Sequence, residues 1–336
     1  MKRGSRLFVL HIFPMPIIVW FSLPLQTFLP SYIVGQPTIK HIIKFLMLFL
    51  STDFFFRLYN TFLDAGEDIF RNWTKCNLFD LPDIAWREIF LLLGRKTKLF
   101  NECKENWARN QNQLLNTTLY HCVKMLQKVC LLSKHVVIKT IRFPLYKLEH
   151  LMTEFQTMKI IQLVRDSRAT LFSRFKMDAK INVKSFTPVV TDFCSRVHRD
   201  LLAMDMFANK FKGRISTFRY EDIAKNPLNM AKSLYEFAGI THTPEVSSHV
   251  YNITMTGNKT DCGKICTVKS NSTATAIHWR SQITLEHAQL IDFVCRPVYK
   301  RLGFKNVENE IMLRNNSIDL RFEHNTLNDN RSNYLD

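Results

Sequence analysis

The segment 160–174 carries the residue types of an anion-binding site. An apolar, strand-like run ends directly before Arg165 and Asp166, and a helical pattern begins near Ser167. Phosphate groups in α/β proteins bind at helix N-termini and at exposed strand ends. The segment therefore predicts a strand, a charged turn and a helix that together face an anion.

Three side chains of this segment can donate hydrogen bonds to a phosphate. Arg165 and Arg168 each offer a forked pair of donors, and Ser173 adds a hydroxyl farther along the helix. The alternative is purely structural. In it, Arg165 forms a local ion pair with Asp166, and the rest of the segment is a solvated helix start.

Other reactive side chains have simpler interpretations. His278 could act as a base, but an isolated histidine is more often an ordinary surface or core residue. Glu221 and Asp222 are expected to cap the following helix. Cys262 and Cys266 have no neighbouring ligand residues, which favours a disulfide over a metal pair. The general base stays unassigned.

Strands alternate with helices along the chain, which predicts an α/β fold with a parallel sheet covered by helices on both faces. One α/β domain over residues 31–305 accounts for the pattern, and the polar tail 306–336 is expected to be disordered. The expected strands are 136–141, 159–164 and 214–220. The expected helices are 84–130, 145–154, 169–180, 191–212, 227–238, with Gly239 as its cap, and 284–301.

Composition points to an anionic partner. The chain has 336 residues, and its 46 Lys+Arg exceed its 29 Asp+Glu by 46 − 29 = 17 charges. Such an excess suits a phosphorylated cofactor, nucleic acid, an acidic glycan or an anionic membrane. Nucleic acid is disfavoured, because the sequence has no basic–aromatic stripe and no zinc-finger spacing. Eight cysteines in so long a chain do not make a disulfide scaffold.

The N-terminal region 1–30 indicates a secretory protein. Three basic residues within 2–6 precede the apolar run 7–29, the pattern of a signal-anchor whose basic end stays cytoplasmic. Prolines in the run disfavour a straight helix. The sequon Asn-x-Ser/Thr occurs at Asn72, Asn116, Asn252, Asn258, Asn271, Asn315 and Asn330. Sequons are used only in the secretory pathway, where the cysteines could also pair.

Four ordered segments resemble the Golgi carbohydrate sulfotransferases, and most closely their galactose/N-acetylglucosamine 6-O-sulfotransferase type. The segment Leu163-Val-Arg-Asp-Ser-Arg-Ala169, ending in Ser173-Arg174, is similar to the family pattern Leu-Val-Arg-Asp-Pro-Arg-Ala followed by Ser-Arg. The other three segments are Val137-Ile-Lys-Thr-Ile-Arg142, Phe218-Arg-Tyr-Glu-Asp-Ile-Ala with Pro227, and His278-Trp-Arg280 with Cys295 and Leu302-Gly-Phe304.

The resemblance implies a P-loop-like sulfotransferase fold and the donor 3′-phosphoadenylyl sulfate (PAPS). It implies transfer of a sulfuryl group to a hydroxyl of a glycan or glycoprotein, without a metal. Arg165 and Ser173 would hold the donor's 3′-phosphate, with Arg168 in the same segment. It also implies a type II Golgi membrane protein with a lumenal catalytic domain. The sugar that is sulfated and the oligomeric state stay open.

The N-terminus departs from the family. There the 5′-phosphosulfate lies in a loop of the form Arg-Ser-Gly-Ser-Ser-Phe, and residues 2–7 are the matching stretch. Gly4 would let backbone N–H groups approach, Ser5 would donate, and Lys2 would meet the charge on the leaving phosphate. Leu23 stands where the family has Glu, and no strand precedes the loop. The N-terminus cannot be both this donor loop and a signal-anchor. Because the donor loop is degenerate, the alternative function is that of a catalytically inactive relative, which binds nucleotide or glycan as a partner of an active enzyme.

Overall fold

The computed structural model describes residues 6–12, 52–81, 98–109, 115–140, 143–177, 183–255 and 271–322. The chain divides into two compact units, where the sequence predicts one domain. Unit 1 comprises 1–10, 20–143 and 147–159, and unit 2 comprises 11–19, 144–146 and 160–336. Each unit is described by itself.

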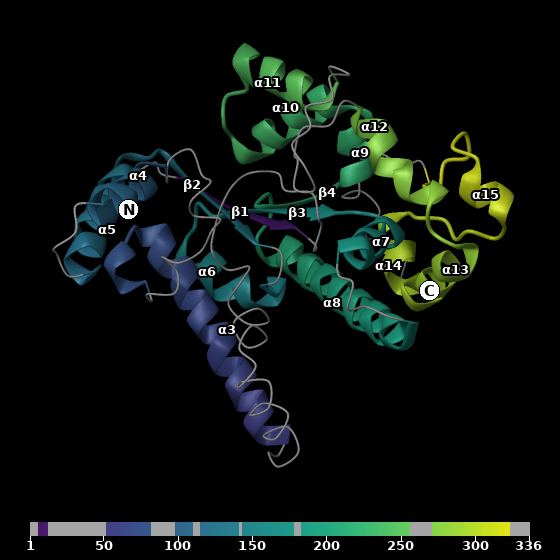
Figure 1. The fold of residues 1–336 in the computed structure, drawn as a ribbon, viewed down its shortest axis with the longest axis horizontal. Coiled ribbons are helices and arrows are strands. Elements are labelled where there is room, and N and C mark those ends of the chain that lie inside the picture. Colours follow the sequence, from purple (N-terminus) through teal and green to yellow (C-terminus); the bar gives the residue numbers. More distant parts are fainter. Residues whose placement is uncertain are drawn as a thin grey trace. The chain divides into compact units, whose positions relative to one another are not determined.

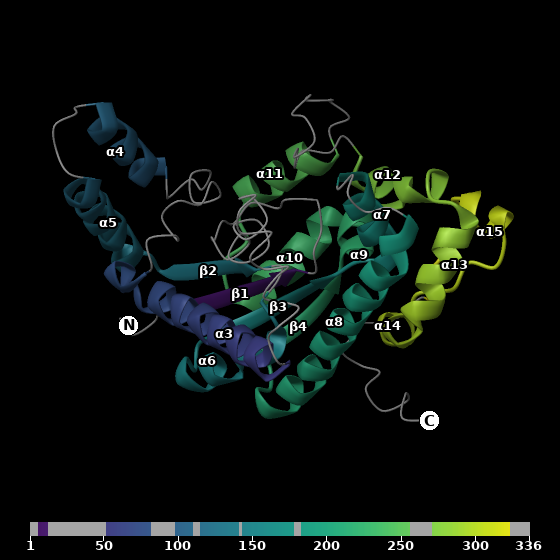
Figure 2. The same ribbon diagram turned by 60° about the horizontal axis from the view of Figure 1, so that its bottom comes forward.

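Unit 1 is mainly helical and carries two disulfide bonds. Its helices and strand β2 are drawn in blue and blue-green in Figure 2. Cys76 at the end of α3 is bonded to Cys130 of α5, and Cys103 of α4 is bonded to Cys122 of α5. Most of strand β1 also lies in unit 1, next to β2. The elements are β1 (Arg6–Ile12), α3 (Thr52–Lys75), α4 (Lys98–Arg109), α5 (Leu115–Leu132), β2 (His135–Thr140) and α6 (Glu149–Glu154), with a short 3₁₀ turn at Leu78–Asp80. A second 3₁₀ turn, Leu145–Leu148, has residues in both units.

Unit 2 is built on a parallel pair of strands, β3 (Lys159–Val164) and β4 (Ile215–Arg219). Between them the chain forms α7 (Ser167–Met177) and the long helix α8 (Val183–Lys210), as parallel strands require a crossover. Figure 1 shows α8 passing beside α13 and α14, against which it packs. The expected α/β fold with parallel strands is confirmed, and β3 is nearly fully buried, as its apolar run predicts.

Short helices complete unit 2 after β4. Two of them end at glycines in the left-handed conformation: α10 at Gly239 (φ 65°) and α14 at Gly303 (φ 70°). Glycine takes this conformation without the cost that a Cβ would add, so both helices stop where the sequence predicts. The helices are α9 (Tyr220–Lys225), α10 (Pro227–Ala238), α11 (Pro244–Thr254), α12 (Ser272–Ile277), α13 (Leu285–Val294), α14 (Arg296–Leu302) and α15 (Glu310–Arg314), with a 3₁₀ turn at His278–Ser281.

Three expectations need correction. Helix α8 begins at Val183, well before the predicted residue 191, and continues through Pro188. The predicted helix 284–301 is two helices, because the chain turns at Cys295, where a disulfide ties it to Cys194 of α8. The tail is ordered as far as residue 322, since α15 forms and Phe304 pairs with Arg321 in an isolated β-bridge.

The N-terminal predictions fall mostly outside the described residues, which omit Lys2, Gly4 and Ser5. The stretch Arg6–Ile12 is strand β1 and not the start of the expected helical anchor. Among the described residues, none of the helices has the length and apolarity needed to cross a bilayer. Cys262 and Cys266 also lie outside the described part of the chain.

Candidate functional site

The candidate site lies where β3 and β4 end. The two strands are parallel and in register, with Val164 opposite Arg219, so their carboxyl ends reach the same edge. Arg165 and Asp166 follow β3 there, and Tyr220 begins α9 directly after β4. Ligands in open α/β sheets bind at this edge of the strands. The fold therefore brings two sequence segments 55 residues apart to one place.

Arg165 is buried at this edge, and two of its side-chain nitrogen atoms donate no hydrogen bond. Its side chain is 6% exposed, and its guanidinium lies 4.7 Å from the centre of the Tyr220 ring. Its Nε and Nη1 atoms are buried and have no hydrogen-bond partner. A buried cation without partners costs free energy, so such atoms point to a ligand. The structural alternative, an Arg165–Asp166 ion pair, is wrong, because Asp166 pairs with Arg168.

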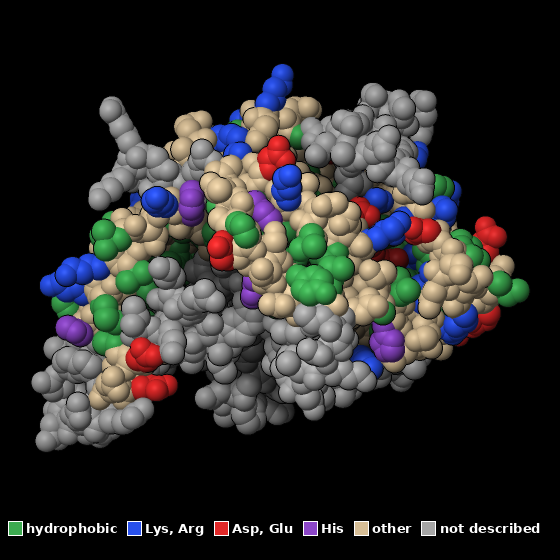
Figure 3. Space-filling view, turned by 90° about the horizontal axis from the view of Figure 1, so that it is seen from above, with side chains coloured by type: hydrophobic (Ala, Val, Ile, Leu, Met, Phe, Trp, Pro, Cys, Tyr) green, Lys and Arg blue, Asp and Glu red, His purple; other side chains and the backbone are tan. Residues whose placement is uncertain are grey.

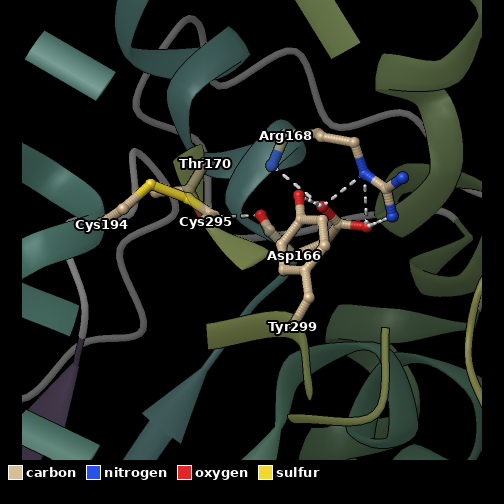
Figure 4. The surroundings of a disulfide bond; sticks show 6 residues. All are labelled: Asp166, Arg168, Thr170, Cys194, Cys295 and Tyr299. Carbon is tan, nitrogen blue, oxygen red and sulfur yellow. Dashed lines mark hydrogen bonds and ion pairs between the residues drawn. A yellow bond between two sulfur atoms is a disulfide. The ribbon is translucent and has the colours of Figure 1, made fainter. Parts of the chain in front are cut away.

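Arg168 is the centre of a buried ion-pair network (Figure 4). Its Nη2 lies 2.7 Å from Asp166 Oδ2, and its Nε donates to Asp166 Oδ1 at 3.0 Å. Its Nη1 lies 3.2 Å from Asp292 Oδ1 and also donates to the backbone carbonyl of Lys305 at 3.1 Å. The guanidinium lies 5.0 Å from the centre of the Tyr299 ring. All three nitrogens are engaged.

This network argues for a structural role of Arg168. The side chain is completely buried, and although burial opposes its charge, Asp166 and Asp292 raise its pKa. The expected role of Arg168 as a phosphate ligand therefore finds no support in this geometry. Burial also raises the pKa of Asp292, to about 6, and it raises the pKa of Tyr299, whose hydroxyl donates to Asp166 Oδ1 at 3.3 Å.

Glu221 belongs to the core of the site. Its Oε1 accepts a hydrogen bond from the backbone N–H of Asp166 at 3.0 Å, and its Oε2 is buried without a partner. Burial and, after it, the charge of Asp166 raise the pKa of Glu221 while the charge of Arg165 lowers it, and together they leave this pKa at about 7. The expectation that Glu221 and Asp222 cap a helix is wrong, since no side chain caps α9 or α10. Asp222 instead accepts from Arg219 at 2.6 Å.

Two further predicted residues lie on α7 and on the 3₁₀ turn at His278–Ser281. Ser173 is half-buried on α7, six residues after the helix begins at Ser167, and its role as a phosphate ligand stays a prediction. His278 is exposed, with its Nε2 atom 2.9 Å from Gln282 Nε2, an ordinary surface arrangement.

A cavity of about 250 Å³ in unit 2 adjoins the candidate site. Asp166 and Glu221 line one part, and the ordered tail with Arg321 lines another. The tail is held by Arg280, which donates to the backbone carbonyls of Met312, Leu313, Asn315 and Ile318 at 2.7–2.9 Å. The Trp-Arg motif therefore anchors the residues that wall this cavity.

Basic side chains do not gather into one stripe on the face shown in Figure 3. The Lys and Arg side chains drawn there are scattered among acidic and apolar ones. On that face, the described part of the chain gives the basic excess no preferred surface. The buried arginines are the more specific positive groups.

Sequence reasoning missed the partners that make the network. Asp292 and Tyr299 lie 124 and 133 residues after the groups they contact, so local spacing carries no signal for them. The sequence identified Trp279 only as part of a motif and gave it no partner. In the structure, the centre of its ring lies 5.1 Å from the Arg168 guanidinium.

Comparison with known proteins gives a consistent picture. Residues 95–244 match the sulfotransferase family. The chain is 32% identical over 226 residues to carbohydrate sulfotransferase 1 of Mus musculus, covering 62% of this chain and 52% of that protein. It is 30% identical over 224 residues to carbohydrate sulfotransferase 3 of Tetronarce californica, covering 62% and 48%. The chain thus spans about half the length of the curated relatives it matches.

Solved structures of low overall similarity were also found. One is the mouse sulfotransferase SULT7A1 complexed with PAP, with 16% identity, coverage of 51% of this chain and 69% of that chain, and a TM-score of 0.33. Another is the sulfotransferase domain from the curacin biosynthetic pathway, with 16% identity, coverage of 60% and 77%, and a TM-score of 0.36. The family match includes β3, the Arg165 turn, β4 and α9, whereas Asp292, Tyr299 and the tail that lines the cavity lie outside it. The stretch 95–244 is therefore similar to the sulfotransferase family, and the curated relatives that match this chain over about half their length are carbohydrate sulfotransferases.

Proposed function

We propose that this protein transfers a sulfuryl group from PAPS to a hydroxyl of a glycan or glycoprotein. One observation supports this most directly. Inside the family-matched region, a buried arginine at the end of a parallel strand keeps two nitrogens without a partner. A doubly charged phosphate is the chemistry that fits such a group, because charge-assisted bonds to arginine are short and strong. The donor's 3′-phosphate supplies it.

The residues of this chain have separate tasks in that reaction. Arg165 and Ser173 bind the 3′-phosphate and fix the donor, so that its sulfur meets the sugar hydroxyl in line. The alternative to a signal-anchor at the N-terminus is a donor loop, in which Gly4, Ser5 and Lys2 offer donors to the phosphosulfate and meet the charge left on the phosphate. The S–O bond to the phosphate breaks as the S–O bond to the sugar forms, and the hydroxyl proton goes to a base. The product nucleotide is 3′,5′-ADP.

The proposed location is the Golgi lumen, with the protein anchored as a type II membrane glycoprotein. Three disulfide bonds support an oxidising compartment: Cys76–Cys130, Cys103–Cys122 and Cys194–Cys295. The seven sequons and the apolar run 7–29 support the same route.

A transfer assay tests the function. The full chain, expressed by a secretory route, is incubated with radiolabelled PAPS and with keratan- and chondroitin-type acceptors that present galactose, N-acetylglucosamine or N-acetylgalactosamine. Label in one of these acceptors is the expected result. Binding of 3′,5′-ADP without transfer supports the inactive relative, and absence of both binding and transfer refutes any donor site.

A further inference from the structure

The inference concerns Glu221 and rests on the proposed function of Arg165. Both side chains are buried where β3 and β4 end, on adjacent segments of unit 2. Glu221 is 8% exposed, and Arg165 is 6% exposed. A buried carboxylate and a buried guanidinium, each with atoms that lack a hydrogen-bond partner, occupy the same edge of the sheet. Neither group is accounted for by the network of Arg168.

The two carboxylate oxygens of Glu221 have different surroundings. Oε1 accepts the backbone N–H of Asp166 at 3.0 Å and so holds the turn between β3 and α7. Oε2 makes no hydrogen bond, and its residue lines the cavity beside the site. A buried, unpartnered oxygen of an acid is costly unless a nearby cation compensates it. Arg165 is that cation, because its guanidinium lies over the ring of Tyr220, the residue before Glu221, and Glu221 Oε1 accepts from the amide of the residue after Arg165. The charge of Arg165 also lowers the pKa of Glu221.

Other charged groups near Glu221 are already satisfied or are exposed. Asp166 pairs with Arg168, as described above. Arg321, on the ordered tail, interacts with Glu221 but is paired with Asp222 at 2.8 Å and with Asp319 at 2.9 Å. Tyr220 stacks on Arg165. The same cavity is also lined by exposed Lys225 and by Arg280, which is occupied by backbone carbonyls.

We propose that Glu221 is the internal counter-anion of Arg165: it balances the guanidinium when no ligand is bound, and it takes up a proton when an anionic donor replaces it. One oxygen keeps the turn in place throughout. The other competes with the incoming 3′-phosphate for the same positive charge. Glu221 is thus a positioning residue that couples donor binding to protonation.

The direction of the coupling follows from the charges. In the free protein, Arg165 lowers the pKa of Glu221, against burial and Asp166, which leave it at about 7. A bound phosphate neutralises the positive charge of Arg165 and brings negative charge close to Glu221. Each of these two effects raises the pKa of Glu221 further. Near neutral pH, binding of an anion at Arg165 therefore draws a proton into the site.

Calorimetry with the full chain measures that proton directly. Binding of 3′,5′-ADP is titrated at pH 7.5 in buffers of different ionisation enthalpy, where the ligand phosphates carry nearly their full charge because their second pKa is about 6. Wild type is expected to take up roughly 0.3 proton or more per nucleotide. The variant Glu221→Gln keeps an acceptor for the Asp166 amide but cannot titrate, so its uptake falls to zero.

The affinities give a second readout. Glu221→Gln should bind 3′,5′-ADP about threefold to tenfold more tightly, because a competing negative charge is removed. The ligand 5′-AMP, which lacks the 3′-phosphate, should show neither the uptake nor the gain. Asp222→Asn is the matched control: it makes the same charge change one residue away, at a group paired with Arg219 and Arg321, and proton uptake should match wild type.

The outcomes separate this proposal from the proposed function. If wild type binds 3′,5′-ADP in preference to 5′-AMP but takes up no proton, the coupling is refuted and the donor site stands. Equal uptake by wild type and Glu221→Gln also refutes it. If wild type binds neither nucleotide, both the proposed donor site and the proposed coupling are refuted. Should Glu221→Gln not fold, the uptake by wild type still decides the question.

Discussion

Replacing Arg165 by methionine tests whether its unpartnered nitrogens serve a 3′-phosphate. Methionine keeps an apolar stem against the Tyr220 ring and removes the buried charge. A hydrogen bond to a charged group contributes about 1.5–3 kcal/mol, so affinity for 3′,5′-ADP should fall roughly tenfold to hundredfold. Affinity for 5′-AMP should stay the same, because that ligand lacks the group that Arg165 contacts.

The stability of the variant separates a binding role from a structural one. Since Nε and Nη1 of Arg165 make no hydrogen bonds, Arg165→Met should lower the free energy of unfolding by no more than about 1 kcal/mol when it is made in Glu221→Gln, where no buried carboxylate loses its counter-charge. The assay is isothermal calorimetry with both nucleotides, together with thermal unfolding. Arg196→Ala is the control, since Arg196 pairs with Asp192 on α8 and should affect neither ligand. An equal loss for both nucleotides would refute the reasoning.

Three further predictions concern stability and modification. Arg280→Ala removes the donors to four tail carbonyls and should lower the free energy of unfolding by roughly 3 kcal/mol or more, measured by urea denaturation. Burial raises the pKa of Asp292 from 3.8 to about 6, so its protonated form favours folding and this contribution is lost as pH rises through 6. Relative to Asp292→Asn, wild type should therefore gain about 2 kcal/mol of stability between pH 7 and pH 4, and a constant difference would contradict this. In a secreted preparation, glycopeptide mass spectrometry should find a glycan on exposed Asn315 but none on Asn72, which lies within α3 and donates to the Asp80 carbonyl.

The strands and the turn at Arg165 were predictable because their signals are local. A β-branched or apolar run of six residues followed at once by charges describes β3 without reference to the rest of the chain. Gly239 and Gly303 end their helices for an equally local reason, their freedom to take a positive φ. Such local signals were enough to predict that a site exists at this strand end and that Arg165 belongs to it.

The partners of the charged residues could not be predicted in the same way. Sequence alone leaves open whether Arg165 or Arg168 pairs with Asp166, and the answer depends on Asp292 and on the Lys305 carbonyl, more than 120 residues away. The tail is polar, so composition predicts disorder, yet hydrogen bonds from Arg280 order it. Polar contacts between residues far apart in the sequence determine both which arginine pairs with Asp166 and whether the tail is ordered.

A structure of the full chain bound to 3′,5′-ADP tests the central claim most directly. The 3′-phosphate should lie within about 2.7–3.0 Å of Arg165 Nε and Nη1, the distance of a charge-assisted hydrogen bond. Arg168 should keep its pairing with Asp166 and Asp292 in the complex. A 3′-phosphate bound elsewhere, with Arg165 still lacking a partner for both atoms, would contradict the assignment of the donor site.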